Sequence, residues 1–341
     1  MSTPTGPRAL NAVNALSATA APLPAPQQPG GLSPATLGWL LGALGVAVFA
    51  LTIPMTRLAS GSLAAPQLPA VFVAIGRAGL GGLLAAAWLL ATRAPWPRPA
   101  QWRQLLLTSL GVVFGFPFFL GLAVQRVDAA HAAVVSGLLP IATAAIGALL
   151  MHQRPSRSFW ACALLGTGLV IGFALWKGGA RPGGTALQLA DGLLLAAVAW
   201  GGFGYVMGAR LSAPQGDGRP PMPPQQVISW VLVACLPITL PVALANWPAE
   251  PVRWVAWGGF VYVSVFSVWL GFFAWYRGLQ LGGMMRVSQI QLLQPFLSMF
   301  LAVPLLGEAL DGVTLAFALA VMATVFGSRR SAVVTAAPPA R

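Results

Sequence analysis

The chain has 341 residues, of which 57% are hydrophobic and 7% are charged, and its formal net charge is +13. Soluble domains carry roughly 25% charged residues, so this composition excludes a soluble enzyme and indicates a protein that crosses a membrane several times. The basic residues are scattered singly between apolar runs. Because they form no basic patch with interleaved aromatics, we expect no nucleic-acid partner.

The first 36 residues are rich in proline, alanine, serine and threonine. This composition cannot bury enough apolar surface for a core, so residues 1–36 are predicted to be a disordered cytoplasmic tail. The closely spaced prolines of APLPAPQQP interrupt any hydrophobic stretch of a signal peptide, and no cleavable signal is expected. The first long apolar run begins near Leu37.

Ten apolar runs follow, each near the length of about 20 residues that spans a bilayer. They occupy residues 37–59, 68–92, 104–124, 129–151, 157–176, 187–209, 226–246, 254–280, 284–306 and 311–328. Because backbone groups in lipid must form their hydrogen bonds internally, each run is predicted to be a helix. The predicted fold is an all-α polytopic membrane protein with ten transmembrane helices.

The basic residues are distributed unevenly over the two sides of this bundle. With the N-terminus in the cytoplasm, the cytoplasmic segments hold 13 arginines, the opposite segments hold five basic residues, and Arg77 lies inside a span. Positive charge favours the cytoplasmic side. We therefore expect both termini, including the C-terminal tail 329–341, in the cytoplasm, and a location in a bacterial inner (plasma) membrane.

The sequence repeats itself with an offset of 155 residues. The shift superimposes Phe118 on Phe273, Gln125 on Gln280, Pro140 on Pro295, and Gly172 on Gly327. The two copies are five spans each, residues 37–176 and 187–328. Because five is odd, the second copy enters the membrane from the opposite side. Inverted repeats of this kind recur in secondary transporters, with the substrate site between them.

Several stretches, in this order and spacing, resemble the drug/metabolite transporter superfamily and within it the EamA-type family. They are AIGRAGLGGLLAAAWLL at 74–90, RPSRSFWACALLGTGLVIG at 154–172, YRGLQLGGMMRVSQIQLLQP at 276–295 and LLGEAL at 305–310. The resemblance covers residues 37–328 and implies two inverted five-helix repeats that move small metabolites. The family often has a Gly-Glu pair at the end of span 4, where this chain has His152 and Gln153.

The resemblance also implies that span 6 helps to line a central cavity. In this chain, span 6 contains the segment AWGGFGY, whose small residues permit close approach of a helix or a ligand. Trp200 and Phe203 are the candidate substrate contacts in this segment.

A polar stripe runs along span 9, because Ser288, Gln291, Gln294 and Ser298 are spaced three or four residues apart and share a helix face. Under the repeat, Ser136 corresponds to Gln291. One interpretation is that the two stripes line a substrate cavity, with Gln291, Gln294, Ser136 and Ser298 as substrate contacts. The other is that these side chains only join helices, at about 1 kcal/mol each.

Pro140 and Pro295 follow Ser136 and Gln291 by four residues. Each proline removes a helix hydrogen bond, so the carbonyl that it frees belongs to the polar residue. The kink is interpreted either as a hinge or as a consequence of helix packing.

Arg77 is the one charge well inside a span, where it costs about 2.5–3.5 kcal/mol on insertion scales. It is interpreted either as a ligand for a substrate carboxylate or as a structural donor to helix-end carbonyls. The resemblance includes an arginine near this position across varied substrates, which favours the structural role.

The remaining chemistry-bearing residues indicate no enzyme site. His131 and His152 have no carboxylate spaced to join them, Cys162 and Cys235 lie in apolar runs, and no metal-ligand spacing or phosphate-binding loop is present. Glu308 and Asp311 are interpreted as the turn and N-cap of span 10. We expect no metal and no cofactor.

A secondary transporter that exports small metabolites, such as amino acids, by alternating access fits these features best. A channel or a structural membrane protein is the alternative, and an intramembrane enzyme is disfavoured because the chain has six acidic residues and none at mid-depth. The expected partners are a small-molecule substrate and the lipid bilayer. The sequence leaves the substrate, the coupling ion and the oligomeric state open.

Overall fold

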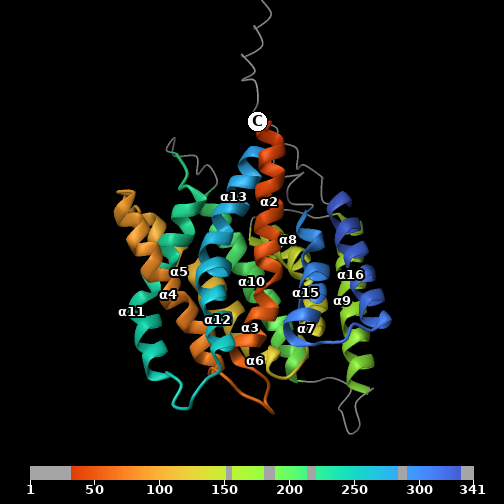
Figure 1. The fold of residues 1–341 in the computed structure, drawn as a ribbon. Helices are drawn as coiled ribbons and strands as arrows, with labels where there is room; N and C mark the ends of the chain where they lie inside the picture. Colours follow the sequence, from red (N-terminus) through yellow and green to blue (C-terminus); the bar gives the residue numbers. More distant parts are fainter. Residues whose placement is uncertain (1–31, 151–155, 180–188, 213–219, 283–289, 332–341) are drawn as a thin grey trace, which may run out of the picture. The chain divides into compact units, whose positions relative to one another are not determined.

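A computed structural model describes residues 32–150, 156–179, 189–212, 220–282 and 290–331 (Figure 1). Regular structure in these residues is helical, with one isolated antiparallel bridge between Gly61 and Pro66. All of the helices belong to a compact unit that begins at Pro34. Ser288, His152 and Gln153 lie outside the described residues.

The helices of the first repeat follow the five predicted spans, and three of those spans are divided. In chain order they are α2 (Pro34–Ala50) with α3 (Thr52–Ser60), α4 (Ala70–Ala91), α5 (Pro99–Ser109) with η1 (Leu110–Gly115) and α6 (Phe116–Val124), α7 (Ala129–Ser136) with α8 (Leu139–Leu150), and α9 (Arg157–Gly179). The second repeat comprises α10 (Leu189–Leu211), α11 (Pro224–Ala245), α12 (Trp254–Tyr262) with η2 (Val263–Leu270) and α13 (Gly271–Gly282), η3 (Ile290–Leu293) with α15 (Gln294–Leu306), and α16 (Gly312–Ser331).

The described helices confirm a polytopic α-helical membrane protein. Seven of them are long and apolar enough to cross a membrane, counting divided helices as one. Three shorter apolar helices, Arg157–Phe173, Gln294–Leu306 and Gly312–Thr324, occupy the positions of predicted spans 5, 9 and 10. Together they follow the order of the ten predicted spans.

Helix packing repeats between the two halves of the chain. The pair α2 and α13 packs extensively, and so does its counterpart, α10 with α6 and η1. Helices of spans that are equivalent by the repeat also pack on each other: α4 on α11 (spans 2 and 7), α7 on α15 (spans 4 and 9), and α9 on α16 (spans 5 and 10). This is the pattern that a pseudo-two-fold axis between two inverted five-helix repeats requires.

Irregular turns occur at equivalent positions in the two repeats. The π-helical turns η1 and η2 interrupt spans 3 and 8, and the 155-residue shift places Leu110–Gly115 within Val263–Leu270. The regular α-helix of spans 4 and 9 is also interrupted just before the prolines. The interruption lies between α7 and α8 in span 4 and between η3 and α15 in span 9. Isolated π turns often mark functional sites in helices.

Glycines allow the closest helix contacts. A Cβ at Gly111 of η1 would collide with the backbone of Gly204 in α10, and a Cβ at Gly278 of α13 would collide with the backbone of Gly42 in α2. Small residues of this kind let transmembrane backbones approach and gain van der Waals contact. The α10–η1 contact joins spans 6 and 3 and the α13–α2 contact joins spans 8 and 1, so both repeats use close glycine contacts between corresponding spans.

Candidate functional site

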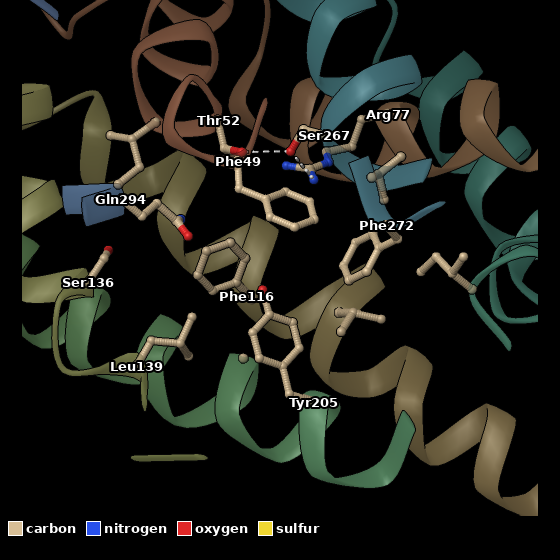
Figure 2. Close-up of a pocket in the computed structure, with 15 residues that line it drawn as sticks. Phe49, Thr52, Arg77, Phe116, Ser136, Leu139, Tyr205, Ser267, Phe272 and Gln294 are labelled. Atoms are coloured by element: carbon tan, nitrogen blue, oxygen red, sulfur yellow. Dashed lines mark hydrogen bonds between the residues drawn. The ribbon is translucent and has the colours of Figure 1, made fainter. Parts of the chain in front are cut away.

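Two adjoining cavities lie where the repeats meet. The central cavity has a volume of about 60 Å³, and a second cavity of about 30 Å³ adjoins it, here called the glutamine cavity. The two share the lining residues Ile53, Ser136, Leu139 and Gln294. The central cavity is also lined by Phe49, Thr52, Arg77, Val112, Phe116, Gly201, Tyr205, Ile228, Ser267, Val268 and Phe272 (Figure 2).

Both repeats contribute to the central cavity. The first repeat supplies Thr52 from α3, Arg77 from α4 and Ser136 from the end of α7. The second supplies Ser267 from the π turn η2 and Gln294 from the first turn of α15. Figure 2 shows these polar groups around a space that aromatic rings fill from several sides. The cavity therefore combines a few polar groups with an apolar wall, as small-molecule sites do.

Arg77 is the charged group of this cavity, and 5% of its surface is exposed. Its Nη2 donates a 3.4 Å hydrogen bond to Ser267 Oγ, and that hydroxyl lies 2.8 Å from Thr52 Oγ1 (Figure 2). Its Nε has no partner among the described residues. No described carboxylate lies within ion-pair distance of the guanidinium, so a buried cation faces the cavity without an anion.

The polar stripe predicted on span 9 reaches the cavities. Gln291, Gln294 and Ser298 line the glutamine cavity, opposite Ser136 of span 4. Ser298 Oγ is buried without a hydrogen-bond partner among the described residues. Thr143 of span 4, which the 155-residue shift superimposes on Ser298, donates to the carbonyl of Leu139, one turn back on its own helix. The structure thus brings the glutamines and Ser136 together, while their contact with substrate stays a prediction.

Pro140 and Pro295 both line the glutamine cavity. Each is the second residue of its helix, α8 or α15, directly after an irregular turn. A proline is tolerated at such a position because its missing N–H has no intrahelical partner to lose. The helix irregularities and the polar side chains therefore coincide at one place between the repeats.

The predicted contacts on span 6 are placed differently. Trp200 and Phe203 line neither of these two cavities. Trp200 is 38% exposed and packs over Gly115, and contact of these two aromatics with substrate stays a prediction. The neighbouring Gly201 and Tyr205 of α10 line the central cavity instead.

Sequence reasoning missed the hydroxyl pair Thr52 and Ser267. Both are polar residues inside apolar runs, which is the signal that identified the glutamines. A single hydroxyl in a span often bonds to its own helix backbone, as Ser264 does with the Phe260 carbonyl. The sequence alone therefore does not distinguish a hydroxyl that faces a cavity from one that caps its own helix turn.

Charged residues gather at one end of the bundle, here called the Glu308 end, formed by the loops 61–69 and 307–311 and the first turn of α7. Glu308 accepts hydrogen bonds from the backbone N–H groups of Ala129 and Ala130, at 2.7 and 3.0 Å. Glu308 thus caps α7 of the other repeat, which corrects the expectation that it belongs to the start of span 10. Asp311 does cap span 10, since it accepts from Thr314 N at 2.6 Å.

The surroundings of Glu308 shift the pKa of its carboxyl group in opposite directions. Burial raises its pKa, the two backbone N–H groups lower it, Asp128 raises it and Arg57 lowers it, with a net rise. Arg57 itself donates to the carbonyl of Val124. At this end Arg57, Glu308 and Asp311 are bonded by the protein, which contrasts with Arg77.

His131 and Asp191 correct another expectation. His131 Nε2 lies 2.8 Å from Asp191 Oδ1, and the two side chains are 5% and 7% exposed. The sequence pattern indicated no carboxylate for either histidine because the pair is 60 residues apart and comes from different repeats. Among the described residues no group of three or more His, Cys, Asp or Glu could hold a metal ion.

Comparison with known proteins agrees with this architecture. The model of the EamA-like transporter family matches twice, over residues 36–175 and 189–330. This chain belongs to the EamA-like transporter family. The two matches coincide with the two inverted repeats. Membership of this family makes the protein a transporter.

Two further similarities support the assignment of this EamA-like chain. It is 40% identical over 302 residues to a protein named uncharacterized transporter YdeK, from Bacillus subtilis (strain 168), covering 87% of this chain and 98% of that protein. A crystal structure of a protein matches with a TM-score of 0.55 at 22% identity, covering 88% of this chain and 99% of the other. The latter similarity concerns the fold alone.

Proposed function

We propose that this protein is a secondary-active transporter that exports small metabolites carrying a carboxylate, such as amino acids, by alternating access. The observation that carries the proposal is Arg77, a buried cation that lines a cavity between inverted repeats and has no described anionic partner. A buried charge without a counter-ion is costly, and a substrate carboxylate would supply the missing partner.

The lining of the central cavity suits an amino acid. A carboxylate can accept from the guanidinium in a charge-assisted hydrogen bond, and the amides and hydroxyls of Gln294 and Ser136 can serve a polar substituent. The rings of Phe49, Phe116 and Phe272 offer an apolar wall to a side chain. The cavities are small, about 60 and 30 Å³. Such volumes are expected of a conformation of the transporter that holds little more than water.

Alternating access requires that inter-repeat contacts at one end break when that end opens. The Glu308 end carries such contacts beside an open pocket of about 680 Å³: Glu308 caps α7, and Gln67 Oε1 accepts from Arg253 N at 3.2 Å. With both termini in the cytoplasm, this end faces away from the cytoplasm. Single cysteines at Ser62 and Glu308 that label only from the cytoplasm would show that this orientation is wrong.

The transport proposal is tested by counterflow in proteoliposomes. Vesicles loaded with unlabelled amino acids are given a panel of radiolabelled amino acids, and saturable counterflow is the result expected of a carrier. Linear, non-saturating flux would favour a channel. An absence of any flux with the whole panel would contradict amino acids as the substrate class, and a second panel of nucleosides and other small metabolites would then be tried.

A further inference from the structure

The open pocket beside the Glu308 end is far larger than either cavity and is here called the outer pocket. Its volume is about 680 Å³, which lies within the range of about 300–1,000 Å³ of small-molecule sites. Both repeats line it, through α3 and the loop 61–67 of the first and through residues 253–255 and 305–309 of the second. None of its lining residues belongs to the central or the glutamine cavity. The outer pocket is therefore a separate candidate site.

Charged side chains of both signs line the outer pocket. They are Arg57, Asp128, Arg253 and Glu308. Arg57 donates to the carbonyl of Val124, and Glu308 accepts from two backbone N–H groups of α7. The Arg253 side chain is exposed, and its guanidinium makes no hydrogen bond or ion pair to a described residue. The described protein therefore leaves this guanidinium available to a ligand.

Arg253 is suited to a carboxylate ligand. Its planar guanidinium presents parallel N–H groups that match the two oxygens of a carboxylate. The backbone of Arg253 is also held in place, because its N–H donates to Gln67 Oε1 at 3.2 Å and the residue is the N-cap of α12. The start of the side chain is thereby fixed at the wall of the outer pocket.

Asp128 supplies the opposite charge in the same pocket. It is the N-cap residue of α7 and is exposed. Asp128 also interacts with Arg57. An ionised carboxylate has about four lone-pair sites for donors, so it can accept from an ammonium beside its other contacts. The central cavity differs, because Arg77 is its charged group and no described carboxylate lines it. Among the described linings, the outer pocket offers partners for both charges of a zwitterion.

Two helices that pack on each other, α3 and α15, run from the outer pocket to the cavities. Arg57 of α3 lines the outer pocket, and Ile53, one turn earlier, lines both cavities. Leu305 of α15 lines the outer pocket, and Ser298, two turns earlier, lines the glutamine cavity. At 1.5 Å per residue, these steps correspond to about 6 Å along α3 and about 10 Å along α15. The outer pocket therefore lies next to the cavities, on the side of the Glu308 end.

We propose that the outer pocket is a second binding site, for zwitterionic amino acids, in which Arg253 binds the carboxylate and Asp128 the ammonium. During transport, an amino acid that passes the Glu308 end occupies this site before or after the central cavity. This place on the transport path rests on the proposed function. Binding in the outer pocket does not rest on it, so the two are tested separately.

Binding is tested by protection of a cysteine in the outer pocket, with glycine as the probe. The chain has two cysteines, so the full-length Cys162→Ala, Cys235→Ala protein with Ser62→Cys carries one thiol, in the pocket lining. In nanodiscs, glycine should slow its reaction with a methanethiosulfonate reagent in a saturable manner. Ala64→Cys, exposed in the same loop and outside the lining, is the matched control and should react at an unchanged rate.

Charge variants show which groups hold the probe. An exposed ion pair is worth up to about 1 kcal/mol, so Arg253→Gln and Asp128→Asn should each raise the half-protecting glycine concentration about 2- to 5-fold. Arg126→Gln removes a positive charge near Asp128 but outside the pocket, and protection should stay unchanged. Acetate and methylammonium, which carry one charge each, should protect less than glycine. Protection should persist in Arg77→Leu, which lacks the cation of the central cavity.

Several outcomes overturn binding in the outer pocket. They are glycine that slows neither thiol or slows both equally, protection that Arg253→Gln leaves unchanged, and protection that disappears in Arg77→Leu. Protection by acetate as strong as that by glycine overturns the assignment of Asp128 and of a zwitterion.

The place of the outer pocket on the transport path is tested by counterflow. Arg253→Gln should raise the apparent KM for the exchanged amino acid about 2- to 5-fold and leave the maximal rate unchanged, while Arg126→Gln should change neither. An unchanged KM in Arg253→Gln overturns this place on the path. If the wild type exchanges no amino acid, the proposed function fails, and the protection of Ser62→Cys still decides whether the outer pocket binds a zwitterion.

Discussion

The central cavity and the Glu308 end each contain an arginine at a buried or half-buried position between the repeats. The two arginines differ in how fully the protein satisfies their hydrogen bonds. Arg57 at the Glu308 end donates to a carbonyl and interacts with Asp128 and Glu308. Within the part of the chain that the structure describes, Arg77 in the cavity has one long hydrogen bond and an Nε without a partner. A charge that only holds helices together is expected to be fully bonded by the protein.

This difference separates a structural charge from a charge kept for a ligand. At the Glu308 end, replacing a partner breaks a bond that the fold uses. Under the proposed function, Arg77 in the central cavity is a group whose partner is the substrate. The two regions should therefore respond in opposite ways: substitutions in the cavity change transport more than stability, and substitutions at the Glu308 end change stability first.

The largest expected effect is that of Arg77→Leu. Loss of a hydrogen bond to a charged group costs about 1.5–3 kcal/mol, so apparent affinity for a carboxylate substrate should fall about 10- to 150-fold. Because an unpaired buried charge is removed, the thermal unfolding temperature should stay or rise. Counterflow and thermal unfolding measure the two effects.

Arg126→Leu is the matched control for Arg77→Leu. Arg126, in the turn after α6, bonds to the carbonyl of Leu122 near the end of that helix and lines neither cavity, so transport should be retained. If Arg77→Leu unfolds the protein and transports normally when folded, Arg77 is structural and the distinction between the two regions disappears.

The amides of the glutamine cavity should give a smaller effect. Loss of one neutral hydrogen bond to substrate costs about 0.5–1.5 kcal/mol, so Gln291→Leu and Gln294→Leu should each weaken apparent affinity about 2- to 12-fold. Gln294 lines both cavities and should have the larger effect of the two. Gln226→Leu, outside both linings, is the control. Normal affinity in both cavity variants would assign the glutamines to helix packing.

At the Glu308 end, Glu308→Ala should reduce stability. Removing a cap from a helix N-terminus costs about 0.5–2 kcal/mol, and here the cap also joins the repeats. Asp311→Ala removes the cap of α16, which joins no repeats, and should cost a similar amount while leaving transport unchanged. Equal transport in both variants would show that the cap on α7 has no part in closing this end.

The Glu308 carboxylate should also give stability a defined pH dependence. Its pKa is raised in the folded protein, with burial as the main cause, so protonation favours the folded state. The stabilisation from this group is complete below the ordinary glutamate pKa of about 4.3 and is lost as pH rises through the raised pKa. The unfolding temperature of the wild type relative to Glu308→Gln should therefore rise as pH is lowered from about 7 to about 5. If the difference in unfolding temperature between wild type and Glu308→Gln stays constant or falls as pH is lowered, the pKa of Glu308 is not raised in the folded protein.

The smallest effect is expected at Gln153, which corresponds to Glu308 under the repeat and lies outside the described residues. Because the two residues differ in charge, Gln153 is predicted only to shape the turn between spans 4 and 5. Gln153→Ala should leave transport within about twofold. A tenfold loss at normal protein levels, which corresponds to about 1.4 kcal/mol, would show that both ends of the bundle carry a functional polar group.

Much of the fold follows from sequence because lipid imposes one simple rule. Apolar runs must be helices, and the matching prolines and phenylalanines reveal the repeat. The interruptions of these helices are harder to predict, since the π turns η1 and η2 depend on how neighbouring helices pack. A run such as 104–124 contains no residue that requires its helix to be divided at Leu110.

Part of the candidate site can also be predicted from the sequence, because a polar residue is conspicuous in an apolar run. Gln294 and Arg77 stand out as polar groups in apolar runs, and both line the central cavity. The direction of a side chain is set by tertiary packing, so the sequence predicts Trp200 and Phe203 in the lining, while Gly201 and Tyr205 are the residues of α10 found there. The bond between His131 and Asp191 crosses the repeats, and no spacing within one helix reveals it.

The central claim is that Arg77 binds the carboxylate of the substrate. The most direct measurement compares, by competition in counterflow, an amino acid with its amide in the wild type and in Arg77→Leu. The wild type should prefer the acid by about 10-fold or more, the value of a charge-assisted hydrogen bond, and the variant should bind the two forms equally. A preference for the acid that survives in Arg77→Leu would contradict the account.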